Sequence, residues 1–402
     1  MTHSVNSERS SAAPKAGPGA SAAPQAGPEV ERQPLAWRTN LWLFLATLAS
    51  VFWTGTQVCV DSADLPFAER AALAIPFTAT LLGILVAHEF GHFIAARIHK
   101  VDASLPFFIP LPFPVSPFGT MGAVIRMRGN IETRRALLDI GAAGPLAGLV
   151  VAIPAYAWGT AHSQLVANTV GAGELGESIM LKVLDHAFGP AVPAGMDLLL
   201  SPVAFAAWIG MFITMINLLP IGQLDGGHIA YALLGTRQDK VAPYVHRSLL
   251  AFFFVSLASF VLRDVRAGFG FFRIGHHVGN TLFWLGLFEF MAVLGTLSSQ
   301  RYARTPDALS IRTRILATVG LVLIAMLGQD ATGVKGTLLW FAWFVGLGLF
   351  LAMDVRWGVL RRHALFDHPS TDAGDLGTGR SIVAIVTLAM FVLLFMPAPM
   401  IQ

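Results

Sequence analysis

The chain has 402 residues, of which 54% are hydrophobic and only 13% are charged. Soluble domains carry charge on about a quarter of their residues, so this composition excludes an ordinary soluble protein and indicates a polytopic membrane protein. The net charge is only +3 and the basic residues lie between apolar stretches, which excludes a nucleic-acid-binding protein. The single cysteine, Cys59, excludes an internal disulfide and a cysteine-based zinc finger, so any metal site must use His, Asp or Glu.

The N-terminal segment 1–34 is rich in Ala, Ser, Pro and Gly and cannot bury enough apolar surface to fold, so we predict a disordered tail. It lacks the apolar stretch and cleavage site of a signal peptide. Three acidic residues, Glu8, Glu29 and Glu31, are unusual in an organelle transit peptide.

After the tail, the hydropathy pattern predicts an all-α membrane protein with about nine transmembrane helices, because a span needs roughly 20 mostly apolar residues. The predicted spans are 40–58, 71–96, 137–159, 197–219, 246–262, 281–298, 314–329, 336–354 and 381–398. Lys and Arg are more frequent on the flanks that share a side with the N-terminus, which places that side in the cytosol. Arg263, Arg266 and Arg273 fall on the opposite side.

Two connecting segments carry further signals. Residues 101–135 contain prolines at 106, 110, 112, 114 and 117, which exclude a long helix. The following stretch 120–128 has the character of a strand, so we expect a β-hairpin or small sheet between spans two and three, dipping into the cytosolic face. Residues 160–196 are polar enough to form an external loop.

The second span contains the sequence His88-Glu89-Phe90-Gly91-His92. Residues four apart lie on one face of a helix, so both imidazoles can reach one ion with Glu89 beside it, as in H-E-x-x-H zinc hydrolases. Three ionisable groups at membrane depth are costly unless they are paired or bind a metal. The alternative is a helix end at which these side chains only form hydrogen bonds to neighbouring spans.

A second motif, NLLPIGQLDGGH, occupies 217–228 at the end of the fourth span. Pro220 and the glycines should break the helix and place Asp225 on a turn near the cytosolic face, where its carboxylate can complete a His2Asp zinc site. Zinc would acidify a bound water, from which Glu89 takes the proton as general base. The alternative for Asp225 is an ordinary helix stop.

These motifs resemble the site-2 proteases, the M50-type intramembrane zinc metalloproteases, in a form without a PDZ or CBS domain. The matching stretches are HEFGH at 88–92, GTMGAVIRMR at 119–128, DIGAAGPLAG at 139–148 and the motif at 217–228. The resemblance implies a catalytic membrane core at 35–230, followed by additional transmembrane helices at 231–402. It also implies one Zn2+ held by His88, His92 and Asp225. The implied activity is that of a metalloendopeptidase with Glu89 as its general base.

The resemblance extends to further residues. It gives Asn217 a role in holding the substrate backbone or the oxyanion, against the alternative of capping the broken helix. For Gly144 and Pro145 we expect close helix packing rather than chemistry. The implied activity is regulated intramembrane proteolysis of a membrane protein, typically a single-span protein already cut by another protease. The edge of the hairpin offers a strand with which an unwound substrate can pair.

The location and the rival functions follow from the same sequence. Its composition favours a bacterial inner membrane, with the active site towards the cytosol and a plastid membrane as the alternative. A transporter or metal-handling protein would use intramembrane His and Asp to line an ion path, but the later spans are almost free of charge. A binding protein without activity is disfavoured by the intact Glu89. A protease of the prenyl-protein-processing type would need a glutamate ligand such as Glu289.

Three other groups of histidines, His228, His276-His277 and those within 363–368, have ligand-type side chains. His228 follows Asp225 within the motif and is read as an exposed interfacial side chain. The other two groups lie in predicted loops, where solvated interfacial histidines are common, so none of the three is assigned to the site.

Overall fold

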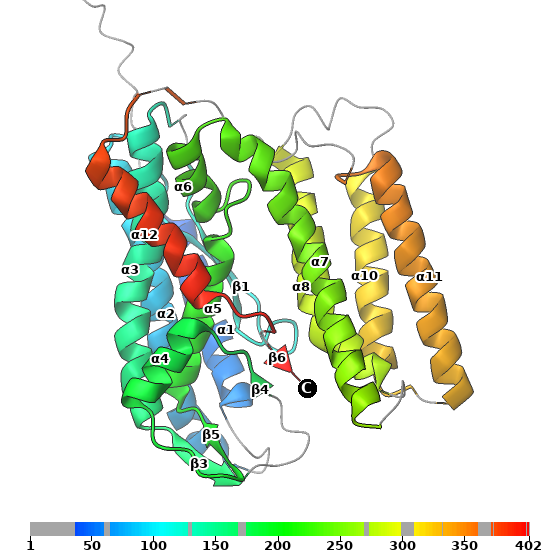
Figure 1. Cartoon of the computed structure of the whole chain (residues 1–402). Helices are drawn as coiled ribbons and strands as arrows, with labels where there is room; N and C mark the ends of the chain where they lie inside the picture. The colour runs from blue at the N-terminus through cyan, green and yellow to red at the C-terminus, as the bar shows by residue number, and fades with distance from the viewer. Residues whose placement is uncertain are drawn as a thin grey trace, which may run out of the picture. The chain divides into compact units, whose positions relative to one another are not determined.

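The computed structural model describes residues 37–59, 65–127, 131–167, 174–268, 273–298, 309–331, 333–360, 371–372, 374–398 and 400–401. The predicted tail at 1–34 and the histidines within 363–368 lie outside these ranges. Most of the described residues are helical (Figure 1). The helices are α1 (Trp37–Val58), α2 (Phe67–Ile98), α3 (Arg134–Ala161), α4 (Ile179–Phe188), α5 (Pro202–Asn217), α6 (Asp225–Leu234), α7 (Arg237–Arg266), α8 (Ile274–Ser298), α10 (Ile311–Gly328), α11 (Gly333–Trp357) and α12 (Thr378–Leu394).

The polytopic helical fold is confirmed, with each of the nine predicted spans falling on a helix. Among the described residues, seven helices are long and apolar enough to cross a membrane: α1, α2, α3, α7, α8, α10 and α11. The other two, α5 and α12, have 16 and 17 residues, or roughly 25 Å at 1.5 Å per residue, which is short of a hydrocarbon core of about 30 Å. For α5 the reason is local, because the chain turns at Pro220 towards the start of α6.

The predicted β-hairpin is present between α2 and α3. Its strands β1 (Phe107–Pro110) and β2 (Thr120–Val124) pair antiparallel, and an isolated bridge between Ala103 and Met127 continues the pairing. The predicted external loop also contains secondary structure: α4, the paired strands β3 (Gln164–Ala167) and β5 (Met196–Leu199), and β4 (Glu174–Leu175), which pairs with β6 (Met400–Ile401).

Polar side chains of α1 hold the hairpin. The Asn40 amide donates to the carbonyls of Leu105 and Pro106, at 2.8 and 2.9 Å. Fourteen residues further along α1, Thr54 accepts a hydrogen bond of 3.1 Å from the backbone N–H of Phe113. That spacing corresponds to about 21 Å of helix, so the hairpin follows α1 along much of its length. Lipid offers no partner for backbone polar groups, and these α1 side chains supply some of those partners.

The two larger apolar cores organise the described helices. One core contains side chains of α2, α3 and α5, including Leu81, Leu149 and Met211. The other contains side chains of α7, α8, α10 and α11, including Phe253 and Trp343. The last helix, α12, packs against α3, α4, α5 and α6.

An ion pair fixes α12 on α3. The Arg380 guanidinium donates to both carboxylate oxygens of Asp139, with its Nη2 at 2.9 Å from Oδ2, and His99 Nε2 lies 2.8 Å from the same oxygen. Residues from beyond position 231 therefore contact the helices that carry the site motifs.

The later helices carry a buried charge network, contrary to the expectation that they are almost free of charge. Arg314 on α10 donates to Glu289 on α8 at 2.6 Å and to Asp354 on α11, and all three residues are at most 2% exposed. The sequence did not reveal the network because Arg314 and Asp354 stand at the ends of predicted spans, where charges normally face water. The absence of charge is thus no argument against a transporter. The mutual pairing of Glu289, Arg314 and Asp354 does argue against a transporter, because these three groups bind one another.

Candidate metal centre

Helix α2 carries His88 and His92 one turn apart. Their side chains are only 5% and 10% exposed, and Glu89, between them in sequence, is also buried. The Glu89 carboxyl group is near enough to both imidazoles to interact with them electrostatically. The sequence thus places a group of ionisable side chains in the part of α2 between Arg70 and Arg97, which is otherwise uncharged.

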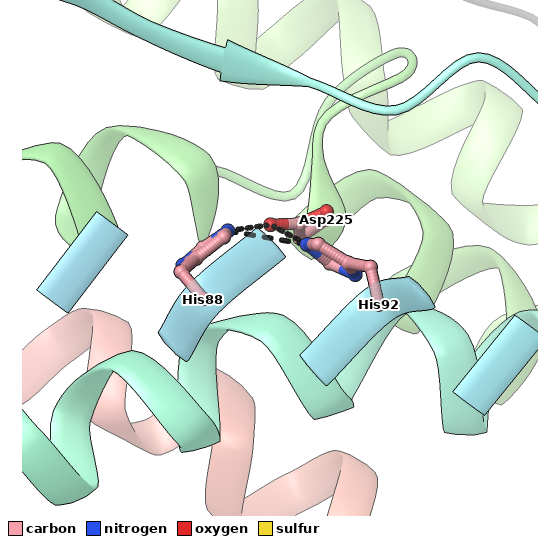
Figure 2. Close-up of side chains that lie close together, drawn as sticks. All are labelled: His88, His92 and Asp225. Atoms are coloured by element: carbon pink, nitrogen blue, oxygen red, sulfur yellow. Dashed lines mark hydrogen bonds and ion pairs between the residues drawn. The ribbon is translucent and has the colours of Figure 1, made fainter. Parts of the chain in front are cut away.

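The third member of the group comes from α6. The chain leaves α5 at Asn217, turns through Pro220 and Gly222, which has φ +57°, and starts α6 at Asp225. We expected Asp225 on a turn; it is instead the first residue of this short helix. Figure 2 shows its carboxylate directed at the two imidazoles, with Oδ2 at 3.2 Å from His88 Nε2 and 3.3 Å from His92 Nε2.

The three ligand atoms form a nearly equilateral triangle, because the two Nε2 atoms are 3.1 Å apart. Ligands of a tetrahedral zinc ion lie about 2.0–2.2 Å from the metal and hence about 3.3 Å from one another. The observed edges of 3.1, 3.2 and 3.3 Å fit that geometry. Within the described residues, this is the one group of three His, Cys, Asp or Glu side chains with ligand atoms this close together.

The protonation state of His92 also suits a metal. Its Nδ1 lies 2.7 Å from the carbonyl oxygen of Ile140 on α3. A carbonyl only accepts, so Nδ1 carries the proton and, in the neutral ring, Nε2 presents a lone pair. Lone pairs of His92 and the Asp225 carboxylate then face each other at 3.3 Å, an arrangement that a shared cation stabilises. A carbonyl behind a ligating histidine is a common support in metal sites.

Glycines on α3 make room for the histidines. A Cβ atom built on Gly144 would lie 2.1 Å from His92 Nε2, whereas one on Gly148 would lie 3.4 Å from His88 Nδ1. On α2, a Cβ on Gly91 would lie 2.4 Å from the carbonyl oxygen of Ala143. Close helix packing was expected at Gly144. The structure adds that Gly144 faces the imidazole itself.

A further set of contacts fixes α6 and was missed by sequence reasoning. Arg134 Nε, at the start of α3, donates to the carbonyl of Ala232 at the end of α6 at 2.9 Å. At the other end of α6, Cβ atoms on Gly226 and Gly227 would collide with the carbonyls of Leu218 and Gly222, at 2.0 and 2.4 Å. An arginine that caps a distant helix leaves no pattern in the sequence, although the paired glycines are visible there.

Asn217, the last residue of α5, borders the group. Its Nδ2 lies 3.5 Å from His88 Nε2, the atom that faces Asp225. This places a neutral amide beside the ligand triangle, where it can contact a substrate.

The remaining histidines have other partners. His277 Nε2 lies 2.9 Å from Asp264 in a buried pair, and His276 Nε2 lies 3.5 Å from Asp330. His228 stands on α6 beside Gly141 of α3. Glu289, the ligand required by the prenyl-processing alternative, is bound to Arg314.

Residues 76–260 match the model of peptidase family M50. This matched stretch is called the M50 segment below. The M50 segment contains His88, Glu89, His92, Asn217 and Asp225, together with α3 and the hairpin.

Curated proteins that are similar to part of this chain come from plants. "Probable zinc metalloprotease EGY1, chloroplastic" of Oryza sativa subsp. japonica is 33% identical over 180 residues, which cover 42% of this chain and 29% of the relative. EGY2 of Arabidopsis thaliana, with the same description, is 32% identical over 163 residues, or 40% of this chain and 28% of the relative. The chain thus spans less than a third of the length of these relatives. No solved structure matches it.

Proposed function

We propose that the chain is an intramembrane zinc metalloprotease that hydrolyses a peptide bond within or near a transmembrane segment of another protein. The observation that carries this proposal is the ligand triangle of His88, His92 and Asp225, with Glu89 beside it on a membrane-length helix. The match of residues 76–260 to peptidase family M50 and the names of the plant relatives support the same chemistry.

Each side chain has a distinct role in this proposal. The two imidazoles and the Asp225 carboxylate bind zinc, which supplies a Lewis acid that acidifies water and polarises a carbonyl. Glu89 accepts a proton from the attacking water and passes it to the leaving amine. Asn217 contacts the substrate backbone or the oxyanion. The Ile140 carbonyl and Gly144 keep the His92 ring in the orientation that presents Nε2.

The hairpin supports a way to present the substrate. Within the described ranges β2 pairs only with β1, and α1 packs against β1. The side chains of Met121 and Val124 on β2 are more than half exposed, and β2 contacts α2, which carries the histidines. An unwound substrate segment can therefore add to β2 as a further strand, with its backbone hydrogen bonds satisfied.

The substrate class and location complete the proposal. The substrate is a membrane protein, typically a single-span protein already cut by another protease, as in regulated intramembrane proteolysis. A bacterial inner membrane, with the site opening to the cytosol, agrees with the distribution of Lys and Arg. The chloroplastic descriptions of the relatives support a plastid membrane as the alternative.

The decisive experiment compares the purified wild type with Glu89→Gln on a single-span reporter in detergent that contains zinc. We expect the variant to bind one zinc per chain and to cleave about 10²–10⁴-fold more slowly, the usual contribution of a general base. Metal content measured by mass spectrometry separates loss of the base from loss of the ion. His88→Ala serves as the control that loses the metal.

Two outcomes would contradict the proposal. Zinc-dependent cleavage at the wild-type rate in Glu89→Gln would remove Glu89 from its role. Absence of cleavage by the wild type, across reporters with Gly, Pro or Asn in the span, combined with zinc uptake into proteoliposomes, would favour a transporter.

Strand addition makes a separate prediction. When single backbone amides of a soluble peptide substrate are N-methylated in turn, KM should rise at every second position, because alternate N–H groups of an added strand face β2. Each lost hydrogen bond is worth about 0.5–1.5 kcal/mol, or roughly 2- to 10-fold. Peptide cleavage assays give the pattern, and a uniform effect along the peptide would exclude pairing with β2.

A further inference from the structure

A groove lies beside the connection between α5 and α6, on the side of the later helices. It has a volume of about 620 Å³ and lies between α7, α12 and α4. Val245, Ser248 and Phe252 line it from α7, and Phe391 and Val392 from α12. Most of these side chains are apolar. Val392 is 59% exposed, so the groove opens beside this residue.

The floor of the groove belongs to the same chain segment as the site. Leu219 and Pro220 line it, and they lie in the connection between Asn217, at 3.5 Å from His88, and Asp225. The Gln238 amide donates to the Pro220 carbonyl at 3.2 Å and holds this floor in place. An occupant of the groove would thus rest against the turn that positions Asp225.

The lining identifies the kind of occupant. Apolar walls on a membrane-length helix, α7, select a molecule that arrives from the bilayer. A helix about 10 Å wide occupies roughly 420 Å³ per 5.4 Å turn, so the groove has room for roughly one and a half turns. Among the lining residues described, the one cation is Lys182, and it is paired with Glu177 at 2.9 Å. Lys182 therefore offers no free charge for the phosphate of a lipid.

We propose that this groove between α7 and α12 is the docking site for the transmembrane helix of the substrate. The inference rests on the proposed protease function and adds a place where the helix is held while its unwound end reaches the metal centre. The groove binds one and a half turns of apolar helix on the lipid side. The hairpin binds the extended segment.

Filling the groove tests the proposal. Ser248→Trp on α7 and Val392→Trp on α12 each place an indole in it without changing a residue of the metal centre. Ala258→Trp on α7 is the matched control, because Ala258 is exposed and does not line the groove. Each variant is assayed on a single-span reporter in proteoliposomes and on a short soluble peptide that contains the same scissile bond.

Both groove variants should cleave the anchored reporter at least tenfold more slowly than Ala258→Trp, while all three cleave the soluble peptide at the wild-type rate and bind one zinc per chain. Equal cleavage of the anchored reporter by all three variants would overturn the docking site, and so would an equal loss on both substrates. Failure of the protease function is distinguishable, because the wild type would then cleave neither substrate.

Cross-linking gives a second readout that does not depend on turnover. In a Glu89→Gln, Cys59→Ala background, Ser248→Cys should form disulfides with single cysteines placed along the reporter span, and the yield should repeat every three to four residues. Ala258→Cys is the control and should give at most a tenth of that yield. Equal yields at the two positions would show that the reporter has no preferred place on α7.

Discussion

Gly144→Ala is expected to abolish metal binding, although it adds only one methyl group. The new Cβ would lie 2.1 Å from His92 Nε2 and 2.5 Å from Cδ2, which is far inside van der Waals contact. The imidazole would have to leave the ligand triangle or α3 would have to move away from α2. Since displacements of about 1 Å can cost 10²-fold in rate, we expect cleavage to fall at least 10²-fold. Zinc should fall below a tenth of an ion per chain.

The control for this prediction is Gly148→Ala, one helical turn along α3. Its Cβ would meet His88 Cβ and Nδ1 at 3.4 Å, an ordinary contact, so zinc content and activity should stay near wild type. Metal analysis of the two purified variants is sufficient. Full zinc occupancy in Gly144→Ala would contradict the prediction. It would mean that α2 and α3 can move apart far more easily than their packing indicates.

Arg314→Met is expected to destabilise the protein by about 3–5 kcal/mol, the usual cost of removing one partner from a buried charge network. It would leave the carboxylates of Glu289 and Asp354 without their shared counter-charge in a site where all three residues are at most 2% exposed. Asp354 also accepts hydrogen bonds from the backbone N–H groups of Val359 and Leu360. Loss of Arg314 should therefore also loosen the end of α11.

The rescue variant is Glu289→Gln, Arg314→Met, Asp354→Asn, which removes all three charges and keeps an acceptor at position 354. Because an uncharged replacement of a buried ion network is often neutral or stabilising, the triple variant should recover most of the lost stability. Thermal unfolding in detergent measures both. A single variant as stable as the wild type would mean that water or lipid headgroups reach the network.

The sequence was sufficient for the α2 part of the candidate site because helical periodicity alone brings His88 and His92 to one face. The approach of Asp225 depended on a helix break that the sequence marks with Pro220 and glycines, but its place at the start of α6 was not predicted. The roles of Arg134 and of the Ile140 carbonyl could not be predicted from the sequence, because each acts through a tertiary contact and neither has a local sequence pattern.

The fold was predicted well where local rules dominate. Hydropathy located the seven long apolar helices and the shorter α5 and α12, and the prolines of 101–135 excluded a helix and left a hairpin. The network of Glu289, Arg314 and Asp354 was not predicted, because hydropathy treats a charge at a span end as solvated. The strands of the external loop and the packing of α12 depend on partners distant in sequence, which periodicity does not report.

The hydrogen bonds from α1 to the hairpin also constrain how the protein is made. Asn40, Ser50 and Thr54 bind backbone groups of residues 105–119, so the hairpin has these partners in lipid only once α1 is beside it. During synthesis α1 leaves the ribosome before the hairpin does. It can therefore already be in the membrane when the hairpin needs its hydrogen-bond partners. A circular permutation that moves α1 to the end of the chain would reverse this order. The hairpin would then have to be held by the translocation machinery until α1 arrived.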